Sequence, residues 1–199
     1  MSALRIRLWL LCLALNCFAA HAQVQAPRHE ILQLDAARSQ AGFTVKVLWL
    51  IGVAGEFGVV RGSLDIDRFR GTARVDARIE ADTLSMRSAH NAKWAKSAEF
   101  FDATHYPQIV FASDDFPLVR LRAGGTLDGT LTLRGIVKPA RFRILPSDCA
   151  QPLAGACAVQ AEGDIERSDF GMHSRRGTLA DKVALRLRIF VAPAQSPAS

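Results

Sequence analysis

Apolar and polar residues alternate along most of this chain, and the two-residue period constrains the fold more than any other feature. In residues 74–80, for example, Val75, Ala77 and Ile79 alternate with charged residues. Successive side chains of a β-strand point to opposite faces, so the pattern predicts strands with one buried face and one face in water. Strands of parallel sheets, buried on both faces, show continuous apolar runs instead. The pattern therefore indicates an all-β, antiparallel protein.

Short connections with Gly or Pro separate the alternating segments, as expected between antiparallel neighbours. They delimit eight or nine strands, at about residues 29–34, 39–48, 56–67, 71–84, 107–116, 125–135, 137–146, 156–168 and 182–192. So many strands must protect their edges: closure into a barrel removes the edges, and a two-sheet sandwich is the alternative. We expect an eight-stranded barrel, whose interior is either filled by side chains or holds one small ligand.

Small residues occur among the large ones at the positions expected to face inward: Ala77, Ala81, Gly129, Ala161 and Gly163. Small side chains inside a barrel indicate either a cavity or tapered packing. The sequence leaves these two readings open.

One segment, residues 85–103, departs from the alternation. Trp94, Ala98 and Phe101 fall at helical spacing within it, and the Tyr106-Pro107 pair follows, which disfavours continuation of a helix. The pattern predicts one short helix, at about residues 87–101, that caps one end of the barrel. We expect Trp94 and Phe101 to act as a lid on the interior.

The first 22 residues are typical of a signal peptide. Arg5 and Arg7 precede an apolar run at residues 8–18, and Ala20 and Ala22 supply the small residues of a cleavage site. The run is shorter than the roughly 20 apolar residues that span a bilayer, although an uncleaved anchor is the alternative. We therefore expect cleavage after Ala22, export to the periplasm, a folded domain at residues 23–192 and a disordered tail at 193–199.

Two of the four cysteines lie beyond the signal segment, Cys149 and Cys157, in a Pro- and Gly-containing loop. An even count in an oxidising compartment favours a disulfide, and seven intervening residues do not fit a redox CxxC motif. We expect a structural bond between them.

The sequence lacks the common motifs of catalysis and metal binding. There is no HExxH, CxxC, phosphate-binding glycine loop or GxSxG motif, and His90, His105, His173, Asp102 and Asp169 are not spaced as metal ligands. Basic residues outnumber acidic ones only by 25 to 19, and no stretch groups five of them with aromatic residues. We expect no metal, no cofactor, no catalytic residue and no nucleic-acid partner.

Several short motifs follow one another in order over residues 34–192. They are Phe43-Thr44-Val45-Lys46, Gly55-Glu56-Phe57 with Gly62, SAEFFD at 97–102, Tyr106-Pro107, LTLRG at 131–135 with Pro139, and RSDFGM at 167–172. In this ordered set the chain resembles the YceI-like family of bacterial polyisoprenoid-binding proteins. The resemblance implies a lipocalin-like, periplasmic barrel whose long apolar interior holds an isoprenoid or another lipid chain. The chain departs from the family at Val47, Trp49 and Ala54, where many members carry His, Gly and Arg.

The alternation and the resemblance together predict a lipid-binding protein that is not an enzyme. The ligand-binding residues expected to line its interior are Phe43, Val45, Ile66, Val75, Ile79, Phe111, Leu131, Leu133, Phe142 and Phe170. The expected partner is a bound isoprenoid or other long-chain lipid. The chain is not expected to span a membrane. The sequence leaves undecided whether it contacts a membrane surface transiently and whether it forms a homodimer. Two alternatives remain: an enzyme acting on a small amphiphile, and a stress or interaction protein with an incidental cavity.

Overall fold

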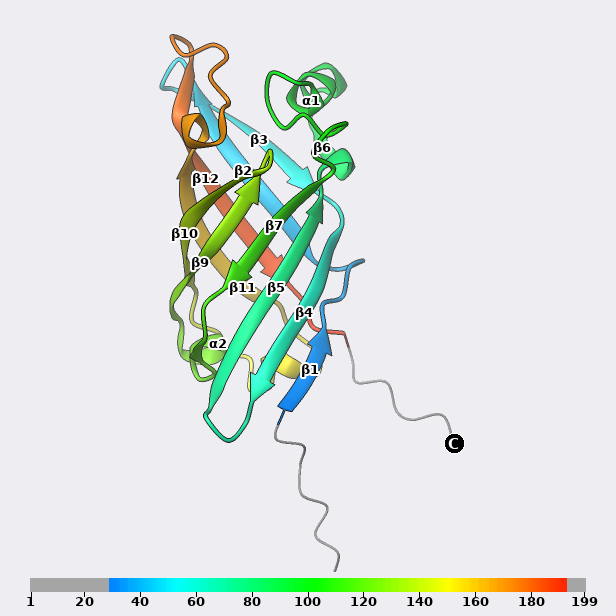
Figure 1. Cartoon of the computed structure of the whole chain (residues 1–199), viewed down its shortest axis with the longest axis vertical. Helices are drawn as coiled ribbons and strands as arrows, with labels where there is room; N and C mark the ends of the chain where they lie inside the picture. The colour runs from blue at the N-terminus through cyan, green and yellow to red at the C-terminus, as the bar shows by residue number, and fades with distance from the viewer. Residues whose placement is uncertain (1–28, 193–199) are drawn as a thin grey trace, which may run out of the picture.

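The alternating segments form one twelve-stranded antiparallel sheet that curls into a barrel (Figure 1). The structure is a computed structural model, and it describes residues 29–192. The strands are β1 (His29–Gln33), β2 (Gln40–Val47), β3 (Ile51–Phe57), β4 (Val60–Asp67), β5 (Thr72–Glu80), β6 (Leu84–Met86), β7 (Gln108–Ser113), β8 (Phe116–Pro117), β9 (Gly125–Leu133), β10 (Ile136–Ile144), β11 (Val159–Glu166) and β12 (Leu179–Ile189). The helices are α1 (Ala89–Lys96) and α2 (Arg120–Ala123), with single 3-10 turns η1 (Ala81–Thr83), η2 (Pro152–Ala154) and η3 (Arg167–Phe170).

The strand order is β1-β4-β5-β7-β9-β10-β11-β12-β2-β3-β6, and β8 pairs with β5 beside β7. The chain ends of the barrel meet next to β1, where Leu34 and Val191 form a bridge. The N–H of Asp35 donates to the carbonyl of Phe190, and that of Ala192 to Gln33, each at 2.8 Å. At the opposite end β6, which follows β5 in the chain, pairs with β3. These links confirm the predicted antiparallel barrel, with more strands than the eight or nine expected.

The largest difference from the sequence prediction is the hairpin of β2 and β3. Residues 56–67 were predicted to be one strand, whereas β3 already begins at Ile51 and β4 at Val60. The predicted strands at 39–48 and 56–67 leave residues 49–55 as a connection, whereas most of these residues belong to β3, and the turn at residues 58–59 falls inside the predicted strand 56–67. Leu48 and Trp49 form the turn between β2 and β3 with positive φ angles of 49° and 65°, a conformation that costs bulky L-residues about 1–2 kcal/mol each.

The predicted helix at 87–101 is shorter in the structure. It begins after Ser88, whose Oγ accepts a hydrogen bond from the N–H of Asn91 at 3.3 Å, and it ends at Lys96. Residues 98–101 form a turn that Arg134 holds in place, because its guanidinium donates to the carbonyls of Ala98 and Phe100. Trp94 is therefore on the helix and Phe101 lies after it, so the shared helical face predicted for them was wrong. The short helix α2 was not predicted.

The helices occupy opposite ends of the barrel: α1 lies at the upper end in Figure 1 and α2 at the lower end. Cys149 and Cys157 are joined by the expected disulfide, with their Cα atoms 6.4 Å apart. The segment that leads into their loop contacts α2, since the N–H of Ser147 donates to the carbonyl of Arg122 at 2.9 Å. The signal peptide, its cleavage site and the tail at 193–199 lie outside the described residues. Within residues 29–192 no helix is long and apolar enough to cross a membrane.

Candidate functional site

The inward faces of the strands enclose a cavity of about 520 Å³. This volume lies within the range of roughly 300–1,000 Å³ that is typical of small-molecule sites. A close-packed core contains few voids larger than one water molecule. Between the two readings of the small inward residues, the structure therefore favours a cavity over tapered packing.

Most of the predicted ligand-binding residues line this cavity. They are Phe43, Val45, Val75, Ile79, Phe111, Leu131, Leu133 and Phe142. Two of the predicted residues do not. Ile66, near the lower end of β4, and Phe170, in η3, are buried in side-chain packing that lies outside the cavity wall.

Glycines on the strands hold the phenylalanine rings against the barrel wall. A Cβ atom added at Gly55 would lie 2.5 Å from the ring of Phe43, and one at Gly163 would lie 2.8 Å from that of Phe142. The rings thus occupy the space of the missing side chains, which leaves the middle of the barrel open. Of the small residues predicted to face inward, Ala77 and Ala161 line the cavity directly, whereas Ala81 is buried outside it. Gly163 makes room for the ring of Phe142, and Gly129 allows close approach of the β7 backbone at Ala112 and Ser113.

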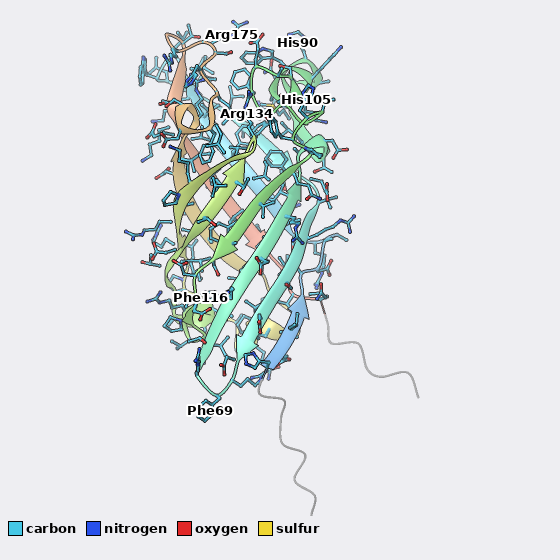
Figure 2. All side chains as sticks on the ribbon, viewed as in Figure 1. Phe69, His90, His105, Phe116, Arg134 and Arg175 are labelled. Carbon is cyan, nitrogen blue, oxygen red and sulfur yellow. A yellow bond between two sulfur atoms is a disulfide. The ribbon has the colours of Figure 1, made fainter. Side chains whose placement is uncertain are left out.

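The lower end of the cavity is closed and apolar. Phe116, labelled in Figure 2, and Leu121 of α2 are buried there beside Leu127 and Ile144. These four side chains carry no polar atom, so this end offers nothing for a polar group to bond. It suits the tail of an apolar molecule.

The upper end of the cavity is its polar mouth. His90 and Asn91 of α1 line it on one side, and Arg175 and Thr178, from the loop before β12, line it on the other. Figure 2 shows His90 and Arg175 at this end of the barrel. The Arg175 guanidinium lies 4.8 Å from the centre of the Trp94 ring, so a cation–π contact connects the two sides. None of these four residues was predicted to line the cavity, because loop and helix residues show no period that marks them as lining a site.

Both predicted lid residues line the cavity beneath this mouth. The ring of Phe101 packs 5.4 Å from that of Phe43 and 5.3 Å from that of Phe57, measured between centroids. Trp94 packs 4.2 Å from Phe100 and donates its Nε1–H to Glu99 at 3.1 Å. The aromatic cluster covers the apolar interior from above. Movement of this cluster on ligand binding stays a prediction.

Arg167, at the start of η3, is a buried anchor that the sequence analysis missed. Its guanidinium donates to the carbonyls of Ala180 at 3.0 Å, of Leu179 at 3.2 Å and of Met172. Burial lowers the pKa of Arg167, and the charge of Asp181 opposes this shift. The bonds fix η3 and the following loop to β12, and thereby shape one side of the mouth. The position of Arg167 within the RSDFGM motif was the available signal.

Asp181 is held on the outer side of the same junction. Burial raises its pKa, but the hydrogen bonds from the Ser168 side chain and N–H and the charge of Arg167 outweigh that effect. The pKa of Asp181 is therefore below its ordinary value.

Polar groups elsewhere on the lid do not form a catalytic arrangement. His105 Nδ1 lies 2.8 Å from Asp102 Oδ1 on the exposed surface, while the nearby Ser97 Oγ accepts from the N–H of Glu99 at 3.4 Å. A nucleophile requires a base within hydrogen-bond reach, and Ser97 is not paired with His105 in this way. In residues 29–192 no three His, Cys, Asp or Glu side chains are grouped to hold a metal ion.

Comparisons with known proteins agree with this geometry. The chain is 30% identical to a UPF0312 protein of Enterobacter sp. (strain 638) over 71% of its length and 72% of the relative. It is 29% identical to Protein YceI of Salmonella arizonae, over 71% of this chain and 73% of that protein.

Solved structures share the fold at lower identity. Burkholderia cenocepacia BcnA superposes with a TM-score of 0.65 at 18% identity, over 80% of this chain and 99% of that one. A polyisoprenoid binding domain from Saccharophagus degradans superposes with a TM-score of 0.59 at 13% identity, over 84% and 99%. The family model of the YceI-like domain matches residues 32–191, from within β1 to just beyond β12. The chain therefore belongs to the YceI-like family.

Proposed function

We propose that this protein is a periplasmic carrier that holds one long apolar chain, of the isoprenoid class, inside its barrel. The observation that carries the proposal is the 520 Å³ cavity, which is apolar at its closed end and polar at its mouth. A molecule with an apolar tail and a small polar head matches this distribution. The head would lie beside His90 and Arg175, and the tail would point toward Phe116.

Burial of the tail supplies the binding energy. Each methylene removed from water is worth about 0.8 kcal/mol, before the costs of association and of ordering the chain are subtracted. Apolar contacts discriminate weakly between chains of similar width. We therefore expect the length and shape of the cavity, rather than hydrogen bonds along the tail, to select the ligand.

The location and the ligand class have independent support. The signal-peptide pattern of residues 1–22 and the Cys149–Cys157 disulfide both fit an exported protein. Among the solved structures of the same fold, one is described as a polyisoprenoid binding domain. A binding role is favoured over an enzymatic one because Ser97 and His105 are not paired as nucleophile and base, and the guanidinium of Arg167 at the cavity is bonded to backbone carbonyls.

The test is a stoichiometric binding experiment. Delipidated mature protein would be incubated with a polyprenol or an isoprenoid quinone, freed of unbound lipid by gel filtration, extracted and quantified. We expect one lipid per chain at saturation, with competition by other isoprenoids and weaker competition by short-chain alcohols. Failure to retain any lipid would contradict the proposal.

A further inference from the structure

The hairpin tip between β2 and β3 exposes four consecutive large apolar side chains. Leu48, Trp49, Leu50 and Ile51 are 54%, 72%, 88% and 61% exposed. The other exposed large apolar residues of the described chain, such as Phe69 and Val119, do not adjoin one another in the sequence. Contiguous apolar surface on a water-soluble domain marks an interaction site, whereas single residues need no explanation.

The tip has an unfavourable backbone conformation, which the fold nevertheless holds in place. Leu48 and Trp49 both have positive φ angles, a region that suits Gly or Asn and not bulky residues. The turn is fixed by two hydrogen bonds, from the N–H of Leu50 to the carbonyl of Val47 at 3.2 Å and from the N–H of Leu48 to that of Thr178 at 2.7 Å. Strain that the surrounding structure maintains is a pointer to function.

The tip stands beside the mouth of the cavity. Val47 and Val53, which flank it in β2 and β3, line the cavity. Thr178, which accepts the hydrogen bond from Leu48, lines the mouth as well. Trp49 itself points into water and lies outside the cavity wall, so it neither narrows nor covers the mouth.

Basic side chains around the mouth form no ion pair within the described chain. None of the ion pairs within residues 29–192 involves the six basic residues that flank it, which are Lys46, Arg87, Lys93, Lys96, Arg175 and Arg176. Two acidic residues at this end have other partners: Glu99 accepts a hydrogen bond from Trp94, and Asp102 is paired with His105.

The β4–β5 hairpin at the opposite end of the barrel has paired basic residues. Arg68, Arg70 and Arg74 at the β4–β5 end each lie within 4.0 Å of an aspartate or glutamate oxygen. Its hairpin tip carries one exposed apolar residue, Phe69, which Figure 2 shows at the far end from Arg175. Four consecutive exposed apolar residues therefore occur only at the mouth end of the described barrel. Among the described residues, the basic residues that flank them form no ion pair, although Arg120 and Arg122 of α2 at the opposite end form none either.

We propose that Leu48–Ile51 insert into the surface of an anionic phospholipid bilayer while the flanking basic residues contact its head groups. An indole beside aliphatic side chains suits the interface between head groups and acyl chains, and Lys and Arg near the surface are attracted to anionic lipids. Docking in this way places the mouth of the cavity against the membrane. The cargo transfer that this permits rests on the proposed function, whereas docking itself rests on the tip and the charges alone.

Vesicle cosedimentation tests docking directly. Mature protein would be mixed with vesicles of phosphatidylglycerol and phosphatidylethanolamine, or of phosphatidylcholine alone. The test variant is Trp49→Asn with Leu50→Ser, which removes apolar surface and places at residue 49 a side chain that tolerates positive φ. The matched control is Phe69→Ser, which removes an equally exposed side chain at the opposite hairpin tip.

We expect wild type and Phe69→Ser to bind the anionic vesicles, and the tip variant to lose roughly tenfold or more of that binding. Binding should be weaker to phosphatidylcholine and should fall with added salt, because the charge contribution is screened. In a Trp94→Phe protein, the emission of Trp49 should shift to the blue on addition of anionic vesicles.

Equal vesicle binding by wild type and the tip variant would overturn the proposal. A wild-type dimer in solution that the tip variant dissociates, without vesicle binding by either, would make the tip a self-interface and would also overturn it. Polyprenol binding in detergent is measured on the same proteins, and the tip variant should retain it. If no protein, wild type included, binds polyprenol, the proposed function is refuted but the docking is not.

Discussion

Replacement of Ala161 by Phe should fill part of the cavity and block lipid binding while the fold survives. Ala161 lies on β11 between Ile144 of β10 and Leu187 of β12, is 7% exposed and lines the cavity. A phenyl ring at this position has no route except into the cavity space. Ala77 of β5 lines the opposite part of the wall, beside Phe111, and Ala77→Phe repeats the test there.

The expected magnitudes differ between a cavity and a solid core. If the ring excludes three or four methylenes of the ligand at about 0.8 kcal/mol each, binding weakens by about 2.4–3.2 kcal/mol. That loss corresponds to roughly a 50- to 200-fold higher Kd. Forcing a ring into a filled core typically costs about 1–3 kcal/mol of stability. Filling empty space returns about 1 kcal/mol for each ~40 Å³ of cavity removed, so we expect Ala161→Phe to lose little stability or to gain some.

The assay pairs a polyprenol titration with urea unfolding of the ligand-free protein. The matched control is Ala184→Phe, because Ala184 is exposed on the outer face of the neighbouring strand β12 and should leave binding unchanged. Lost binding with a stable fold is the predicted result. Unfolding at much lower urea in Ala161→Phe, together with a wild type that binds no lipid, would show a packed core and refute the reasoning.

Three further predictions concern the lid, the disulfide and an acidic residue. With Trp49 replaced by Phe, the emission of Trp94 should change when a long-chain isoprenoid is added, and unchanged emission at saturating ligand would count against a mobile lid. Peptide mapping without reduction should recover the Cys149–Cys157 bond, and two titratable thiols in the native protein would contradict it. Reduction of the bond should lower the free energy of unfolding by about 2–3 kcal/mol without loss of the barrel. Folding lowers the pKa of Asp181, so its ionised carboxylate stabilises the folded state at neutral pH, and this stabilisation is lost as pH falls through the folded pKa. Asp181→Asn should therefore lower the free energy of unfolding at pH 7 and make that free energy depend less on pH in acid. An unchanged pH dependence in acid would refute this.

The strands that sequence reasoning predicted well are those whose burial follows a strict two-residue period. In β5, Arg74, Asp76 and Arg78 are exposed, whereas the intervening Val75, Ala77 and Ile79 line the cavity. The alternation in such strands indicates which face is buried, and most of the cavity-lining residues could therefore be predicted from the sequence.

Prediction failed where tertiary contacts override local signals. Residues 51–55 were predicted to be a connection but form most of β3, and the turn before them is held by a hydrogen bond from Leu48 to Thr178 in the loop before β12. Phe101 leaves the helix because Arg134, far along the chain, binds the carbonyls before it. The cavity itself depends on where phenylalanine rings lie against glycines of adjacent strands, which is a property of register and not of either strand alone.

Native mass spectrometry of the protein purified without detergent from its own organism tests the central claim most directly. The mass should exceed that of the mature chain by the mass of one lipid, released on collisional activation and identified by fragmentation as an isoprenoid or a similar long-chain molecule. Ala161→Phe, purified in the same way, should lack the adduct. A wild-type mass equal to the bare chain, in a protein that also takes up no isoprenoid when one is supplied, would contradict the claim that this barrel carries a lipid.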